Sequence, residues 1–132
     1  MSKAINTWGR RKSAIARATL RPGKGIVRWN KRKIETISQN MMRLRMQEPL
    51  ILAGDVLKTV DIDVNAFGGG TSSQADATRL AIARALAKHD KKLEKVFLDY
   101  DRTLLVADVR QKETHKPNCH GKARAKRQKS YR

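Results

Sequence analysis

The amino-acid sequence predicts an α+β fold on three observations. Residues 13–20 and 60–66 alternate small or apolar side chains with polar ones, which is the period of a half-buried strand. Residues 71–90 place apolar side chains at helical spacing. The expected elements follow in the order β-β-α-β-α-α-β, without the regular alternation of a parallel α/β protein. The length of 132 residues fits one domain with a tail and rules out a large multidomain enzyme.

The first two strands are expected to form a hairpin over residues 13–30. The first, SAIARATL at 13–20, keeps small and apolar side chains on one face. RPGKG at 21–25 has the proline and glycines of a turn, and GIVRWN at 25–30 supplies a short second strand.

A helix is expected next, over residues 39–53, with Pro49 breaking or kinking it. Its core-facing side chains at helical spacing are Met42, Met46 and Leu50, with Leu44.

The clearest strand and the clearest helix follow each other. Residues 56–67 alternate towards a core and end at three glycines, 68–70. The helix over 71–90 has Thr71 and Gln74 at the spacing of a capping box. Its apolar stripe, which is expected to lie against a sheet, consists of Ala75, Thr78, Ala81, Ile82, Ala85 and Leu86.

The last elements are a short helix and a strand. Asp90 can cap a helix over 91–100, and TLLVAD at 103–108 is an apolar strand candidate. Beyond Val109 no core pattern remains, so the tail has too few apolar groups to fold alone.

Charge is distributed unevenly. The chain has 30 Lys and Arg against 12 Asp and Glu, for a net charge of +18. Residues 1–45 carry 13 basic groups and one acidic group. Residues 46–109 carry eight basic and ten acidic groups, and residues 110–132 carry nine basic groups and one acidic group. The two ends are therefore typical of surfaces that bind a polyanion, and the middle of an ordinary folded domain.

Nucleic acid is the favoured polyanion. A membrane surface would need a basic helix with a bulky apolar face, and the only sizeable apolar side chain after Arg110 is Tyr131. A disordered solubilising or targeting tail is the alternative for the last block. Apolar runs reach only four residues, so no membrane span is expected. The single cysteine, Cys119, and a start without a secretory signal favour the cytoplasm.

Catalytic and metal-binding patterns are weak. GGGTSS lacks the lysine of a phosphate loop, so the glycines are interpreted as a turn, with binding of a phosphate, including an RNA phosphate, as the alternative. His115, Cys119 and His120 lack a fourth ligand at finger spacing, and RNA-facing polar side chains are the favoured interpretation. Asp61 and Asp63 are interpreted as solvated or salt-bridged. We expect no catalysis, no metal and no cofactor.

Seven stretches together resemble the universal ribosomal small-subunit protein family number nine, in its archaeal form. In chain order they are GRRKSAIARATL at 9–20, GKGIVRWN at 23–30, EPLILAGD at 48–55, VDIDV at 60–64, GGGTSSQADATRLAIARAL at 68–86, YDRTLLVADVR at 100–110 and QKSYR at 128–132. One stretch departs from the family, because NCHG at 118–121 keeps a single glycine of a glycine-rich segment.

The resemblance implies a two-layer sandwich of a mixed sheet and helices with a left-handed βαβ crossover, of the ribosomal protein S5 domain 2-like type. It implies a globular RNA-binding domain over 1–109 and an extended basic tail over 110–132. The domain would bind rRNA in the head of the small subunit beside other head proteins. The tail tip would contact the tRNA in the peptidyl site. No membrane or small-molecule partner is implied.

Two groups of site residues follow. The expected rRNA contacts, basic groups of both ends, are Arg10, Arg11, Lys12, Arg17, Lys24, Arg28, Lys31, Arg32, Arg110, Lys112, Lys122, Arg124, Lys126 and Arg127. The expected tRNA contacts, carried over from the family's tip, are Lys129, Ser130, Tyr131 and Arg132.

Two other functions remain open at this point. The protein subunit of ribonuclease P is similarly small and basic, and would bind a catalytic RNA. Small-molecule kinases of the galactokinase and homoserine kinase group share the crossover and a glycine-serine loop, although this chain is too short for their second half.

Overall fold

The computed structural model describes residues 3–119, 123–124, 130 and 132. Five strands form one sheet in the order β1-β2-β5-β3-β4. In sequence order the strands are β1 (Ile5–Arg11), β2 (Ala14–Pro22), β3 (Val27–Trp29), β4 (Arg32–Lys33) and β5 (Val60–Phe67). All neighbours are antiparallel except β3 and β5, which are parallel.

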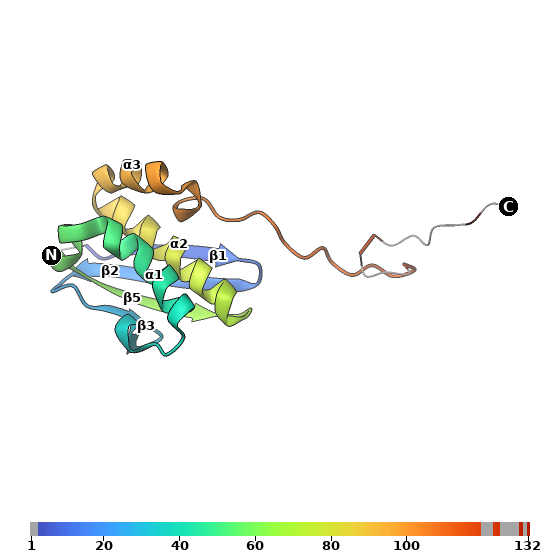
Figure 1. Cartoon of the computed structure of the whole chain (residues 1–132), viewed down its shortest axis with the longest axis horizontal. Helices are drawn as coiled ribbons and strands as arrows, with labels where there is room; N and C mark the ends of the chain where they lie inside the picture. Colours follow the sequence, from blue (N-terminus) through green and yellow to red (C-terminus); the bar gives the residue numbers. More distant parts are fainter. Residues whose placement is uncertain (1–2, 120–122, 125–129, 131) are drawn as a thin grey trace.

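Helices form a second layer on one face of the sheet (Figure 1). The α-helices are α1 (Asn40–Ala53), α2 (Thr71–His89) and α3 (Lys91–Tyr100). Short 3₁₀ helices span Ile34–Thr36, Gly54–Thr59 and Arg102–Leu104. Helix α2 packs against β1, β2 and β5, and α1 packs against α2. The α+β prediction is therefore confirmed as a mixed sheet with helices.

The hairpin expected over 13–30 is wrong. β2 pairs with β1 on one side and with β5 on the other, so β5 lies between β2 and β3. The turn residues after Pro22 bond to the start of β5 and the residue before it: Gly23 N donates to Thr59 O and Gly25 N to Val60 O, both at 3.0 Å. The backbone of β5 thus forms the hydrogen bonds with β2 that β3 would have formed in a hairpin.

Strand β1 was absent from the sequence prediction, and its composition explains why. It is an edge strand whose two buried residues are Thr7 and Gly9, so it has no apolar alternation. A Cβ on Gly9 would lie 2.2 Å from Ala77 O and 2.8 Å from Ala81 N. Gly9 is therefore the residue that lets α2 rest directly on the backbone of β1.

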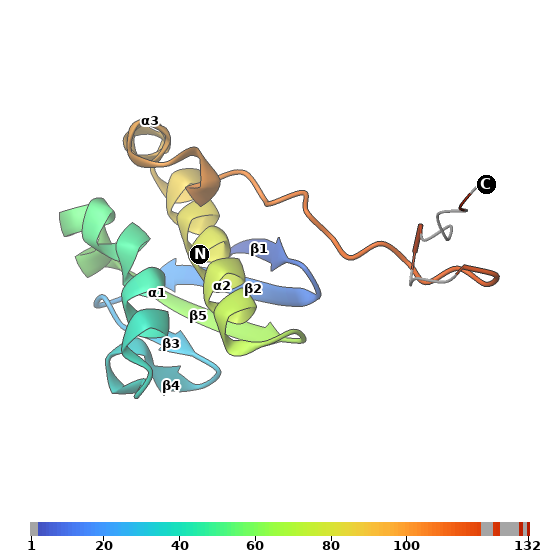
Figure 2. The same cartoon turned by 45° about the vertical axis from the view of Figure 1, so that its right-hand side comes forward.

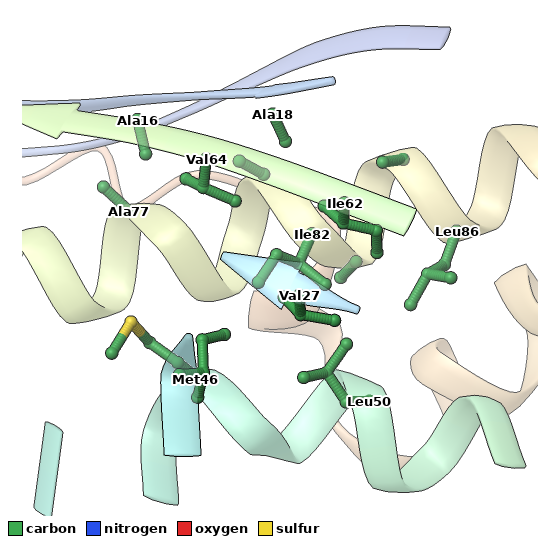
Figure 3. Close-up of a cluster of buried hydrophobic side chains, with 14 of the residues drawn as sticks. Ala16, Ala18, Val27, Met46, Leu50, Ile62, Val64, Ala77, Ile82 and Leu86 are labelled. Carbon is green, nitrogen blue, oxygen red and sulfur yellow. The ribbon is translucent and has the colours of Figure 1, made fainter. Parts of the chain in front are cut away.

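The core lies between the sheet and the helices. The alternating residues of β5 are buried as predicted, and so is the predicted stripe of α2. Figure 3 shows Ala16 and Ile62 of the sheet facing Ala77 and Ile82 of α2, with Met46 of α1 beyond them. The alanines keep α2 close to the sheet, because their small side chains allow a short distance between backbones.

Two helix details differ from prediction. Helix α1 continues through Pro49, which is itself buried, so the proline does not break the helix, and a kink there stays a prediction. Leu44 is 48% exposed rather than in the core. Helix α2 has no capping box: its N-cap is Gly70, and Gln74 Nε2 donates to Gly68 O at 3.0 Å. In α1, packing against α2 outweighs the loss of the backbone hydrogen bond that the proline cannot donate. In α2, the helix begins directly after the glycine turn, without a side-chain cap on its first N–H groups.

The glycine turn itself is as predicted. Gly68 and Gly69 have φ of 74° and 60°, and a Cβ on Gly68 would lie 2.6 Å from Ser13 O. These are left-handed conformations that favour glycine. The glycines thus make a tight passage from β5 to α2.

The strand expected over 103–108 is wrong, and the strand expected over 56–67 begins only at Val60. Asp101 caps the 3₁₀ turn by accepting from Thr103 N at 2.9 Å, and Leu104 is fully buried. This apolar segment therefore contributes Leu104 to the core from a 3₁₀ turn, and it does not pair with any strand of the sheet. Asp90 caps α3 through Lys92 N, as predicted.

Candidate nucleic-acid interface

The sheet face away from the helices is uncovered among the described residues. Because side chains alternate along a strand, the residues between the buried ones emerge on this face. Pairing places Trp8 beside Arg17 and Arg17 beside Asn65, with Arg10, Ile15 and Phe67 in the next row. We call this surface the open face; its basic side chains are Arg10, Arg17, Arg21, Arg28 and Lys33.

The two acidic residues of the open face are occupied within the protein. Arg28 Nη1 donates to Asp63 Oδ1 at 3.2 Å. Asp61 Oδ1 accepts from Ile26 N at 2.9 Å and from Lys24 N at 2.8 Å. These backbone bonds lower the pKa of Asp61, Ile26 N contributing most. Asp63 is salt-bridged as expected, and Asp61 positions the loop that carries Lys24.

Two tight turns present the other predicted basic groups. Lys12 has a φ of 52° in the turn from β1 to β2, and Arg10 Nε donates to its carbonyl at 3.2 Å. Asn30 and Lys31 have φ of 47° and 69° between β3 and β4.

The second turn is held against β5. Asn30 Nδ2 donates to Ala66 O at 3.2 Å, and its Oδ1 accepts from Ala66 N at 2.8 Å. Lys31 and Arg32 are therefore exposed on a turn that is fixed to the sheet.

Two aromatic side chains, Trp8 and Phe67, are exposed beside arginines, whereas Trp29 packs inwards. The Arg17 guanidinium carbon lies 5.8 Å from the centre of the Phe67 ring, and that of Arg84 lies 5.0 Å from Trp8. Trp29 instead donates from Nε1 to Thr78 Oγ1 at 3.1 Å and packs against the core. Trp8 and Phe67 are about half exposed and are the aromatic side chains available beside the basic groups.

Arg11 differs from the other predicted contacts, because its guanidinium is engaged inside the protein. Nη1 lies 2.7 Å from Asp108 Oδ2, and Nε lies 3.1 Å from Asp76 Oδ2 on α2. Arg110, through its side chain and then its backbone N–H, holds the pKa of Asp108 well below its usual range. Arg11 thus ties residues 105–110, which we call the tail root, to the domain.

After the tail root the described chain has no helix or strand and leads away from the domain (Figures 1 and 2). Arg110 and Lys112 are exposed, and Arg124 pairs with Glu113 at 2.5 Å. Ser130 and Arg132 are exposed. The predicted contacts that lie outside the described residues are Lys122, Lys126, Arg127, Lys129 and Tyr131.

His120 also lies outside the described residues, so the cluster with His115 and Cys119 stays an expectation. Within the described ranges no three His, Cys, Asp or Glu side chains gather as metal ligands. The helices that the structure describes are all too short or too polar to cross a bilayer.

Three arginines were missed as candidates: Arg45, the last residue of the basic first block, and Arg79 and Arg102 of the near-neutral middle segment. Arg45 of α1, Arg79 of α2 and Arg102 line one hollow together with Arg10 and Arg110. They come from separate elements and have acidic neighbours in the sequence, so neither charge count nor spacing could have identified them.

Comparison with known proteins gives a consistent result. The family model described as ribosomal protein S9/S16 matches residues 9–132. Proteins named small ribosomal subunit protein uS9 from two archaeal species, Methanococcus vannielii and Methanococcus maripaludis strain C7, are each 47% identical over 133 residues. Each alignment covers 98% of this chain and 99% of the relative. The chain therefore belongs to the ribosomal protein S9/S16 family, a family of ribosomal structural proteins rather than of enzymes.

Proposed function

We propose that this chain is a structural constituent of the small ribosomal subunit, located in its head and bound to small-subunit rRNA. Support comes from the end-to-end match to relatives named as small-subunit proteins. The net charge of +18 supports a polyanionic partner, because a compact chain with that charge repels itself unless counter-charges are near. The protein would act in the cytoplasm as part of the ribosome.

The observation that carries the RNA-binding part is the open face. Arg10, Arg17 and Arg21 are exposed on it, and its two carboxylates are occupied by Arg28 and by backbone N–H groups. Lys and Arg side chains that neutralise RNA phosphates release condensed counterions, which favours binding. Trp8 and Phe67 add stacking surface for unpaired bases. The loop of Lys24 and the turns of Lys12, Lys31 and Arg32 extend this surface.

The division into a domain over 1–109 and a tail over 110–132 is part of the proposal. Ordering a tail residue costs of order 1 kcal/mol of backbone entropy. Charge-assisted contacts to phosphates offset that cost, so the tail would order on RNA. At the tip, Arg132 would pair with a tRNA phosphate and Lys129 would add a point charge. Such backbone contacts accept every tRNA, because they do not read sequence.

The finer fold assignment is also proposed. β3 and β5 are parallel neighbours joined through α1, which is a βαβ unit. We assign it the left-handed crossover of the S5 domain 2-like fold, with neighbouring head proteins as further partners.

RNA binding tests the proposal. The full chain is titrated with small-subunit rRNA and, separately, with large-subunit rRNA at several salt concentrations. We expect tighter binding to small-subunit rRNA. We also expect the slope of log K against log salt to decrease by about one in Arg17→Gln. Lys95→Gln removes the same charge from the exposed side of α3 and should leave the slope unchanged. Equal affinity for the two RNAs would reject the proposal.

A further inference from the structure

A hollow of about 700 Å³ lies where α1, α2, the end of β1 and the tail root meet. This volume is in the range of ligand pockets, roughly 300–1,000 Å³. Its lining is unusually rich in arginine: Arg10, Arg11, Arg45, Arg79, Arg102 and Arg110. Two acidic residues line it, Asp76 and Asp108. Elements distant in sequence thus bring guanidinium groups to one place.

Each of the two aspartates is shared between two arginines. Asp76 pairs with Arg11 at 3.1 Å and with Arg45 at 3.2 Å. Asp108 pairs with Arg11 and with Arg110, both at 2.7 Å. Two carboxylates therefore hold three guanidinium groups in place and leave one positive charge uncompensated.

Arg79 has acidic partners of its own. Its Nη2 lies 3.1 Å from Asp101 Oδ2, and its Nε pairs with Glu48. When these two carboxylates are counted with the two that line the hollow, six arginines face four acidic groups. A positive excess therefore remains around the hollow.

Several guanidinium donors are still available to a ligand. Arg102 is exposed, and its side chain donates to no group among the described residues. Arg45 uses only Nη1 in its contacts with Ser72 and Asp76. A guanidinium carries five N–H donors in a fork that matches phosphate oxygens. Arg102 and Arg45 can therefore accept an anion without giving up the internal pairs.

We propose that this hollow is a binding site for phosphate groups of an RNA backbone. The proposal rests on the proposed function for the identity of the polyanion, and it locates one contact of that polyanion. RNA is favoured over an acidic protein because the hollow opens at the root of a tail with nine basic and one acidic residue. That tail needs a continuous polyanion beside it.

The site would also direct the tail. Arg102 belongs to the last turn of the domain, and Arg110 belongs to the tail root. An anion held by both would join the two segments, adding to the Arg11–Asp108 pair. The tail would then leave the domain along the bound RNA.

Pyrophosphate is the first probe, because it presents two linked phosphates without base or sugar. Binding is measured by calorimetry on the full chain at low salt. We expect Arg102→Gln to weaken binding about tenfold, as for the loss of a charge-assisted contact. Lys95→Gln, which removes the same charge outside the hollow, should bind as the wild type does. Absent pyrophosphate binding, or equal weakening in the two variants, would overturn the site.

Competition distinguishes the occupants. A short oligoribonucleotide should displace pyrophosphate from the wild type and should bind more weakly to Arg102→Gln than to Lys95→Gln. Equal oligoribonucleotide affinity in the two variants would reject RNA and leave a site for free phosphate compounds. Displacement by polyglutamate with the same Arg102 dependence would reject RNA in favour of an acidic peptide. A chain that binds rRNA but not pyrophosphate would lose this site and keep the proposed function.

Discussion

Arg11 Nη1 lies 2.7 Å from Asp108 Oδ2, and this ion pair joins the end of β1 to the tail root. Both side chains are about three-quarters shielded from solvent, with 28% and 21% of their surfaces exposed. Since Arg11 also pairs with Asp76 on α2, the tail root is fixed relative to this central helix. Arg11, which was expected to contact RNA, thus holds the tail root against the domain.

Asp108→Asn should loosen the tail root. It removes the charge that holds Arg11 and Arg110, and it weakens the acceptor of the Arg110 N–H. We expect faster amide hydrogen exchange over residues 106–111, because local opening requires breaking these contacts. Asp99→Asn changes an exposed carboxylate of α3 and serves as the control. Unchanged exchange over 106–111 in Asp108→Asn would contradict the anchoring role.

Gly9→Ala should destabilise the domain. The added methyl would meet Ala77 O at 2.2 Å and Ala81 N at 2.8 Å, so β1 and α2 must separate. Overpacking of this kind costs about 1–3 kcal/mol, and contact with backbone on both sides places Gly9 near the upper value. Urea denaturation measures the difference.

Gly70→Ala is the matched control, because a Cβ on Gly70 would meet no atom within 4 Å and its φ is −106°. Its effect on the free energy of unfolding should stay within about 1 kcal/mol, the size of a helix-cap effect. Equal stability of the wild type and Gly9→Ala would show that the contact between β1 and α2 is looser than described.

Asp61 should make the stability of the fold depend on pH in the acidic range. Its pKa is lowered in the folded protein from the ordinary 3.8, first by Ile26 N–H and then by Lys24 N–H. A carboxyl group with a lowered folded-state pKa stabilises the fold above its unfolded pKa. That stabilisation is lost as the pH falls below 3.8 towards the folded-state value.

Asp61→Asn should therefore lower stability at neutral pH and lose less on acidification than the wild type. Urea denaturation at neutral pH and at pH about 3 measures both values. Asp99→Asn again provides the control, since its side chain is exposed on α3. Equal losses on acidification in Asp61→Asn and the wild type would contradict the role of this carboxylate.

Deletion of residues 129–132 should weaken tRNA binding without preventing assembly of the small subunit. The deletion leaves the domain and most of the tail, so small subunits should still assemble. Affinity for peptidyl-site tRNA should decrease about tenfold, since charge-assisted phosphate contacts are lost. Lys116→Gln, upstream in the tail, should bind tRNA as the wild type does. Equal tRNA affinity and frame maintenance without the tip would argue against its role.

The sequence predicted the parts of the fold that have strong periodicity. The alternation of β5 and the stripe of α2 mark the two layers that pack together, and both are buried as expected. Edge strand β1 could not be predicted in this way, because Gly9 is selected by contact with α2 and carries no periodic signal. The false hairpin has a similar cause, since only tertiary pairing places β5 beside β2.

The interface shows the same division. Charge counts identified the basic ends, and the exposed Arg17 and Lys31 agree with a surface role. Charge counts could not separate Arg11, which is engaged by Asp76 and Asp108, from its exposed neighbour Arg10. Nor could they find the hollow of Arg45 and Arg102, because that site exists only after α1 and the tail root meet.

Sedimentation of a native lysate through a sucrose gradient tests membership of the small subunit most directly. We predict that the protein travels with small subunits and with whole ribosomes. It should also remain with the small-subunit peak when low magnesium separates the subunits. Recovery at the top of the gradient, or with a catalytic RNA of another size, would contradict the account.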